Sequence, residues 1–335
     1  MKNIKNGYKL EDVLLGAQSV ASESKNVRIN HDKAEEISQK YSKEDLQLPV
    51  WDAPVFPEKS NDEAIDFILL GNSINFAFND FKTGEKYVHE YKGVPFKGAY
   101  GMWAALKGAL DEGLPILNAT YLENLSSADA ERIFNGNSKI PMLDERVNIL
   151  NEVGRVLNKK YEGHFYNLVE KADGRLFNNG RGLVELLVED FPSFRDDAIY
   201  NGRRISFAKR AQLGSAMVYE KFLPGGSHLF DEKDIERLTV FADYELPKAL
   251  RSMGVFEYGA SLADKIDNGK LIEAGSNEEV ELRACTIAVA SEMKEDINRI
   301  KKSNAVNALH IDYRLWLDGR NYKDAKAHMT VTTAY

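Results

Sequence analysis

The chain is poor in cysteine and histidine, and it has no long apolar run. Its one cysteine, Cys285, excludes an intrachain disulfide and fits a reducing compartment, so we expect a cytoplasmic protein with a buried, unreactive thiol. No segment approaches the ~20 consecutive apolar residues of a membrane span, and the N-terminus lacks the apolar core of a signal peptide. The six histidines lack the spacing of zinc ligands, which argues against a metal site.

Short motifs of the common enzyme classes are also missing. The sequence contains no Walker loop and no GxGxxG, HExxH or GxSxG segment, and no Ser/His/Asp set can be assembled from spacing. The formal net charge is −8. This charge argues against a general nucleic-acid binder, which needs a basic face to displace counterions. A small anionic ligand held by a few local cations remains compatible with it.

Helical patterns dominate what is present. Hydrophobic residues make up 43% of the 335 positions, enough for a sizeable core. We expect helices at residues 7–22, 31–41, 100–111, 144–160, 183–188, 206–220, 276–302 and 305–317, and short helices within 118–133. We expect a loop at residues 46–62, which hold three prolines, and a strand of a small hairpin at 86–91. Residues 64–78 fit either a strand or a buried helix.

The domain organisation follows from the absence of any linker. No repeat and no low-complexity stretch separates the expected elements. The sequence therefore predicts a single, mainly α domain over residues 1–335, with a small β-hairpin element. Its N-terminal helical part covers about 1–60 and its core about 64–317.

The stretch LTVFADYELPKAL, residues 238–250, carries the most informative residue. Asp243 sits in an apolar run between the aromatic residues Phe241 and Tyr244. A buried carboxylate is costly unless it is paired or used, and in such surroundings it can stabilise a developing positive charge. Aspartate is also a preferred helix N-cap, and Pro247 suits the first turn of a helix. Both interpretations stay open on the residues alone.

Other polar residues also lie among apolar and aromatic neighbours in the sequence. Lys209 lies in ISFAKRAQLGSAM, Asn75 in INFAF, and Asp312 in ALHIDYRLW with Trp316 one helical turn later. Each alone fits a solvated face or a local cap. Together, these carboxylate, amide and cationic groups among aromatic residues indicate a pocket for a flat, polar ligand.

Eight segments give the chain a family resemblance. In order they are FILLGNSINFAF (67–78), KGALDEGLPI (107–116), LDERVNILNEVG (143–154), FPSFRD (191–196), ISFAKRAQ (205–212), TVFADYELPKALRSMG (239–254), EEVELRACTI (278–287) and ALHIDYRLW (308–316). With these segments the chain resembles the queuosine salvage protein family, the queuosine-nucleotide N-glycosylases, from about residue 11 to residue 316.

The resemblance implies a fold, an activity and two catalytic residues. The implied fold is a mainly helical domain similar to DNA glycosylases. The implied activity is hydrolysis of queuosine 5′-monophosphate to queuine and ribose 5-phosphate, with no metal or organic cofactor. The family's catalytic aspartate carries over to Asp243 in FADYELP, and its active-site lysine carries over to Lys209 in AKRAQ.

This activity suggests a role for each candidate residue. Asp243 would stabilise or attack the oxocarbenium-like ribose, and Lys209 would bind the 5′-phosphate or orient that carboxylate. A flat base calls for aromatic stacking. The candidates for stacking are Phe76, Phe241, Tyr244, Tyr313 and Trp316. Asn75 and Asp312 would bind the base edge, the diol and the cationic arm of queuine, and Trp51 and Asp52 align with a ligand-contacting segment of the family.

Two departures and two alternatives complete the sequence-based picture. The family often places an acid directly after the tryptophan of DYRLW, whereas here Asp318 follows one position later, and the end HMTVTTAY (328–335) matches the family poorly. One alternative function is a tRNA or DNA base glycosylase, although we expect no stable nucleic-acid complex. The other is a non-catalytic queuine-binding protein. The sequence leaves the oligomeric state open.

Overall fold

Helices form most of the computed structural model, which describes residues 8–225 and 229–335. The first half contains α1 (Val13–Glu23), β1 (Val27–Ile29), α2 (His31–Tyr41), α3 (Asp62–Ser73), β2 (Val88–Tyr91), β3 (Val94–Lys97), α4 (Ala99–Asp111), α5 (Ala119–Glu123), α6 (Ser127–Ile133), α7 (Leu143–Lys160) and α8 (Phe165–Lys171). The second half contains α9 (Leu183–Asp190), η1 (Pro192–Phe194), β4 (Asp197–Tyr200), β5 (Arg203–Ser206), α10 (Lys209–Phe222), η2 (Leu223–Gly225), α11 (Glu232–Ile235), α12 (Glu245–Ser252), β6 (Phe256–Tyr258), α13 (Ala260–Asp267), α14 (Asn277–Lys301) and α15 (Ala308–Asn321). The predicted mainly α fold class is confirmed.

The strands of the described residues form three antiparallel pairs. β2 pairs with β3, which confirms the predicted hairpin, and β4 pairs with β5 in a second hairpin. The third pair joins distant parts of the chain, because β1 aligns Val27 with Tyr258 of β6. This pairing fastens the N-terminal helices to the C-terminal half.

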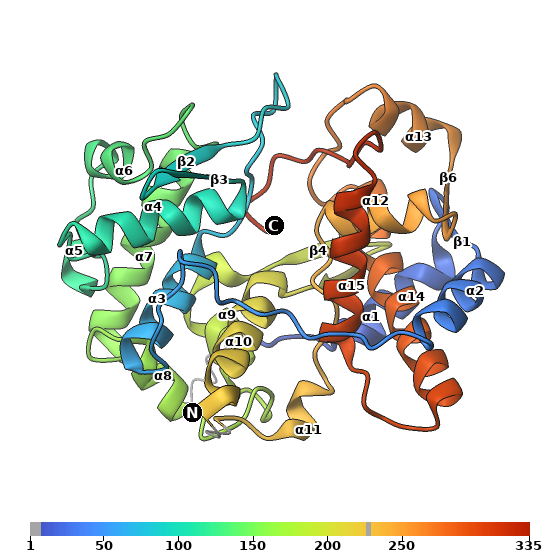
Figure 1. The fold of residues 1–335 in the computed structure, drawn as a ribbon, viewed down its shortest axis with the longest axis horizontal. Helices are drawn as coiled ribbons and strands as arrows, with labels where there is room; N and C mark the ends of the chain where they lie inside the picture. The colour runs from blue at the N-terminus through green and yellow to red at the C-terminus, as the bar shows by residue number, and fades with distance from the viewer. Residues whose placement is uncertain (1–7, 226–228) are drawn as a thin grey trace, which may run out of the picture.

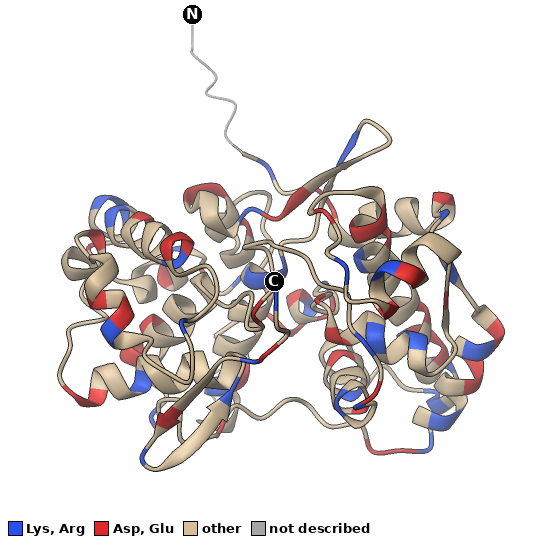
Figure 2. Ribbon diagram, turned by 90° about the horizontal axis from the view of Figure 1, so that it is seen from above, with Lys and Arg blue, Asp and Glu red and all other residues tan. Residues whose placement is uncertain are grey.

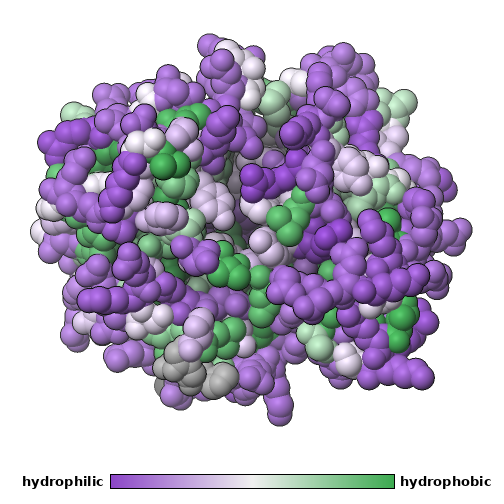
Figure 3. Space-filling model, in the orientation of Figure 1, coloured by the Kyte–Doolittle hydropathy of each residue, from purple (hydrophilic) through white to green (hydrophobic). Residues whose placement is uncertain are grey.

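Two apolar cores organise the molecule. The first core is built by buried residues of 55–238 with Phe241 and Leu309, and the second by buried residues of 13–46, 198–207 and 240–315. Figure 1 shows the corresponding helical groups, with α3 to α8 on one side and α1, α2 and α12 to α15 on the other. Figure 3 shows the same face of the molecule hollowed near its centre.

Local signals explain where several helices begin. The apolar stretch 64–78 resolves into α3, which starts behind the cap Asn61, followed by non-helical residues 74–78. The helix expected at 7–22 begins at Val13, because Asp12 caps it by accepting a hydrogen bond from the Leu15 amide, and residue 7 lies outside the described residues. The helix expected from residue 206 begins at Lys209, since Ser206 belongs to β5.

The surface carries charges of both signs. Figure 2 shows basic and acidic residues interspersed over the helices at both ends of the molecule. Among the described residues, no helix combines the length and the apolar character needed to cross a bilayer.

Candidate active site

A cavity of about 330 Å³ lies where the two cores meet. Phe56, Phe78 and Trp103 of its wall belong to the first core, and Leu246 and Trp316 pack with the second. Nine of the residues singled out in the sequence line it: Trp51, Asn75, Lys209, Phe241, Asp243, Tyr244, Asp312, Tyr313 and Trp316. The volume is in the range of small-molecule sites.

Asp243 lies at the start of α12, where it both caps the helix and faces the cavity. Its Oδ1 accepts a hydrogen bond from the Glu245 amide at 2.8 Å, although the backbone N-cap position is occupied by Tyr244. The side chain keeps 20% exposure, through which it lines the cavity. Burial raises the pKa of Asp243, against the opposing effect of Lys209. Both interpretations of Asp243 therefore hold, because it caps the helix and also lines the cavity.

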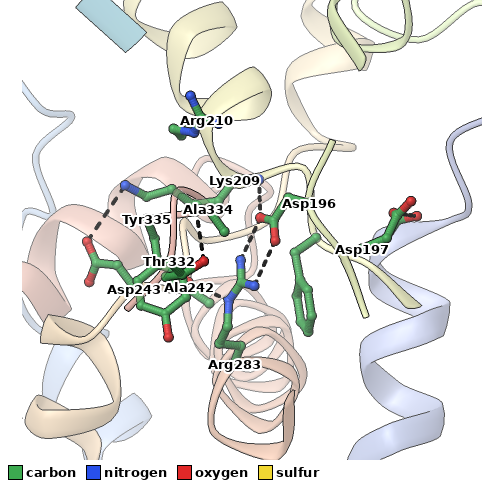
Figure 4. A network of polar contacts seen from close by, with 12 residues as sticks. Asp196, Asp197, Lys209, Arg210, Ala242, Asp243, Arg283, Thr332, Ala334 and Tyr335 are labelled. Carbon is green, nitrogen blue, oxygen red and sulfur yellow. Dashed lines mark hydrogen bonds and ion pairs between the residues drawn. The ribbon is translucent and has the colours of Figure 1, made fainter. Parts of the chain in front are cut away.

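Lys209 is the first residue of α10, and its side chain points toward Asp243 (Figure 4). Its Nζ lies 3.9 Å from Asp243 Oδ2, and its side chain is only 7% exposed. Burial lowers the pKa of Lys209, while Asp243 and Asp312 oppose that shift. The pair brings together one buried cation and one carboxylate whose second oxygen, Oδ1, is held by the α12 backbone.

Asp312 supplies a second carboxylate from α15. Its Oδ1 accepts a hydrogen bond from the Phe241 amide at 2.7 Å, which joins α15 to the segment that carries Asp243. Burial is the main cause that raises the pKa of Asp312 to about 7, and Asp243 adds to the rise. Near neutral pH this group can therefore donate or accept a hydrogen bond.

Aromatic rings form much of the wall around these charges. Tyr313 and Trp316 stack with ring centroids 6.2 Å apart and an interplanar angle of 19°. Phe241 and Tyr244 line the cavity beside Asp243. A flat ligand would find apolar faces here and charged groups beside them.

Comparison with known proteins decides the family. The model of the family described as queuosine salvage protein matches residues 55–335. The chain belongs to the queuosine salvage protein family. Similar proteins named queuosine 5′-phosphate N-glycosylase/hydrolase occur in Sphaerobacter thermophilus (34% identity, 92% of each chain), Mus musculus (32% identity, 92% of this chain and 93% of the relative) and Schizosaccharomyces pombe (32% identity, 91% and 90%).

The match to the queuosine salvage family extends over the C-terminal segment 328–335, where we expect poor agreement. This segment is built into the molecule: His328 Nε2 lies 3.0 Å from the Tyr335 hydroxyl, and both side chains are buried. The Tyr335 carbonyl accepts a hydrogen bond from the Ala77 amide at 3.1 Å, and Tyr335 lines the cavity.

Two of the predicted ligand contacts lie outside the cavity wall. Phe76 is fully buried, and its ring lies 4.3 Å from the guanidinium carbon of Arg146 and 5.3 Å from that of Arg210. It supports the segment behind Asn75 rather than facing a ligand. Asp52 is exposed and is not among the lining residues, although its neighbour Trp51 is.

Asp318 has a structural role, in line with the shifted position of the acid in this queuosine salvage protein. It accepts a hydrogen bond from the Tyr41 hydroxyl and lies 3.3 Å from Arg314. Asp318 therefore ties α15 to α2.

Sequence reasoning missed several cavity residues. They are chiefly Lys86, Lys97, Tyr100, Trp103, Arg320 and Tyr335. Lys86 precedes the hairpin, Lys97 is its last residue, and Tyr100 and Trp103 lie in the first turns of α4. Their local sequence does not distinguish them from ordinary lysines of a hairpin or aromatic residues of a helix. They meet at the cavity only through packing between distant segments.

Proposed function

We propose that the chain hydrolyses the N-glycosidic bond of queuosine 5′-phosphate, releasing queuine and ribose 5-phosphate. One observation carries the proposal: Asp243 and Lys209 lie 3.9 Å apart in a cavity lined by aromatic residues. Relatives of the chain are named for this activity. The C1′–N bond breaks, a water oxygen adds to C1′, and the base leaves with a proton.

Asp243 is the group proposed to face the anomeric carbon. Bond cleavage builds positive charge on the ribose, and a partly buried carboxylate stabilises that charge more strongly than it would in water. The hydrogen bond from the Glu245 amide fixes Oδ1 of Asp243. The other carboxylate oxygen, Oδ2, is the one that faces Lys209. Such fixation avoids reorganisation as the charge develops.

Lys209 is proposed to orient Asp243 rather than to bind the phosphate. A buried ammonium 3.9 Å from the carboxylate favours the ionised form of Asp243, which is the form that can meet a cation. The 5′-phosphate then needs other cations, and Lys86, Lys97 and Arg320 line the same cavity. Lys86 is the best placed of them, because its Nζ lies 3.9 Å from Glu245, two residues after Asp243.

The base is proposed to stack among the rings of Phe241, Tyr244, Tyr313 and Trp316, with Asn75 and Asp312 binding its polar groups. Aromatic stacking contributes about 1–3 kcal/mol per base in single-strand binders. A carboxyl such as Asp312 can serve a base donor or the cationic arm of queuine. No stable complex with nucleic acid is part of this proposal, since the net charge of −8 works against one.

The deciding experiment measures queuine release from queuosine 5′-monophosphate by chromatography with mass detection. The purified chain is expected to turn over the nucleotide and to leave intact queuosine-containing tRNA unchanged. Binding of queuine without turnover would instead identify a carrier. Release from intact tRNA would identify a nucleic-acid glycosylase.

A further inference from the structure

A cluster of buried charges lies directly behind the cavity. Asp196, Glu279 and Arg283 are 6%, 3% and 2% exposed, and none of them lines the cavity. Asp196 ends the segment FPSFRD, and the other two lie in EEVELRACTI, two of the segments that carry the family resemblance. The proposed chemistry gives these segments no role.

The centre of the cluster is a two-point ion pair between Asp196 and Arg283. Arg283 Nη1 lies 2.8 Å from Asp196 Oδ1, and Nη2 lies 2.6 Å from Oδ2. Nη1 also lies 3.4 Å from Glu279 Oε1. Two parallel N–H···O bonds fix both the distance and the relative orientation of the two groups.

This pair is bonded to the backbone beside each residue of the proposed catalytic pair (Figure 4). Arg283 Nε donates to the carbonyl of Ala242, the residue before Asp243, at 3.2 Å. Asp196 Oδ2 accepts a hydrogen bond from the backbone amide of Lys209 at 3.1 Å. One ion pair thus connects α14 to the α10 start and to the segment before α12.

The guanidinium has little room to move. Its carbon lies 3.9 Å from the centroid of the Phe207 ring and 4.6 Å from that of Tyr335. By contrast, the Lys209–Asp243 separation of 3.9 Å is longer than a hydrogen bond. The alignment of those two side chains therefore depends on how firmly their backbones are held.

We propose that the Asp196–Arg283 ion pair sets the distance between Lys209 and Asp243, and that Asp196 and Arg283 are positioning residues of the reaction. The inference rests on the proposed function, because it concerns the same catalytic pair. A misplacement of about 1 Å at a reacting group can cost about 100-fold in rate. Loss of this pair is therefore expected to lower kcat much more than it changes KM.

The first test variant is Asp196→Asn, with Asp234→Asn as its matched control. Asp234 is also buried (1% exposed) and also forms a two-point pair, with Arg175 at 2.8 and 3.1 Å. It accepts a hydrogen bond from the Leu176 amide at 2.9 Å, and it does not line the cavity. The two changes therefore remove equivalent charges, but only one lies behind the catalytic pair.

Steady-state kinetics on queuosine 5′-monophosphate and thermal unfolding are measured for each folded variant. Asp196→Asn is expected to lower kcat at least about tenfold with KM within about threefold, while Asp234→Asn keeps kcat within about twofold at a similar loss of stability. The inference is overturned if Asp196→Asn keeps kcat within that twofold range. Equal kcat losses in both variants would also overturn it, because they would report general destabilisation.

A second variant keeps the test decisive if Asp196→Asn does not fold. Arg283→Lys retains a cation between Asp196 and Glu279 but cannot reproduce the fork that also reaches Ala242. The same kcat and KM criteria apply to it, and failure of both variants to fold would overturn the inference in favour of a purely structural pair. Wild-type chain that releases no queuine would instead defeat the proposed function.

Discussion

Asp243 shows how one side chain can cap a helix and also line a cavity. Its Oδ1 holds the Glu245 amide, so the carboxylate is fixed before any ligand arrives. Asparagine offers the same acceptor without the charge. The two functions can therefore be separated by one substitution.

Asp243→Asn is expected to lower kcat for queuosine 5′-monophosphate at least ~100-fold, because it removes the charge that faces the oxocarbenium-like centre. The melting temperature should change little. Asp12→Asn is the matched control, since Asp12 caps α1 through the Leu15 amide at 2.9 Å and does not line this cavity. Near wild-type turnover by Asp243→Asn would refute the assignment.

The roles proposed for Lys209 and Lys86 predict different effects on the nucleotide and on the free nucleoside. Lys209→Ala should reduce kcat/KM by similar factors for the nucleotide and for the free nucleoside, because its proposed role is to orient Asp243. Lys86→Ala should reduce kcat/KM about tenfold for the nucleotide alone, as expected for a lost phosphate contact. Kinetics with both substrates measure this. A nucleotide-selective loss in Lys209→Ala would assign the phosphate to Lys209.

Asp312 makes the stability of the chain depend on pH. Its pKa of about 7 lies above that of an unfolded aspartate, so the folded state holds the proton more tightly. This contribution is fully present below the unfolded pKa and is lost as pH rises through about 7. The unfolding free energy should therefore fall more steeply between about pH 5 and pH 8 in the wild type than in Asp312→Asn.

Urea unfolding of both proteins across that range tests this. The expected difference is roughly 1–3 kcal/mol, which is the cost of ionising the buried group. Asparagine can still accept the Phe241 amide, so the comparison isolates the charge. Parallel stability curves would show that Asp312 is already ionised in the folded state at low pH.

At the scale of elements, the wall of the cavity depends on how closely α3 and α4 approach. A Cβ built on Gly71 of α3 would lie 1.9 Å from Cζ3 of Trp103, which is buried and lines the cavity. A side chain there forces the indole to move. Position 71 is thus one of the few where only glycine fits the packing.

Gly71→Ala should destabilise the chain by about 1–3 kcal/mol and weaken substrate binding, because overpacking displaces Trp103. Gly108→Ala on α4 is the control, since its new methyl would meet Tyr91 no closer than 3.7 Å. That change should be neutral or stabilising by up to ~1 kcal/mol, as expected for alanine in a helix. Thermal unfolding and KM measurements check both, and equal stabilities would contradict the packing argument.

Element types were more predictable than element contacts. The helix at residues 31–41 and the hairpin at 86–91 follow from local patterns, and so does the helix at 276–302, which is α14 behind its Ser276 cap. Residues 64–78 could not be assigned because α3 is buried almost all round and so has no polar face. Ala208 adopts a left-handed conformation (φ 49°), so α10 starts only at Lys209. An alanine gives no hint of this conformation in the sequence.

At the scale of the whole molecule, the site could be predicted only in part. The family resemblance identifies Asp243 and Lys209 as site residues. It does not predict that their side chains lie 3.9 Å apart, because 34 positions separate them in the sequence. Phe76 lies in the first core and not in the cavity wall, and its aromatic character fits either place. Lys86, Trp103 and Tyr335 join the site only through packing between distant segments.

We predict that residues 1–335 unfold as one cooperative unit, since residues of both cores line the cavity and Phe241 and Leu309, from C-terminal segments, pack in the first core. Tryptophan fluorescence and far-UV circular dichroism should give coincident thermal transitions. The probes are well distributed, because Trp51 and Trp103 pack with the first core and Trp316 with the second. Two separated transitions would indicate two domains.

The second core also has a consequence for synthesis of the chain. Its residues 13–46 must wait for α14, more than half of the chain later, before their apolar faces are covered. At ribosomal rates of about 5–20 residues per second, this wait lasts on the order of 10 s or more. During that time the apolar faces of α1 and α2 that pack against α14 in the folded chain stay uncovered.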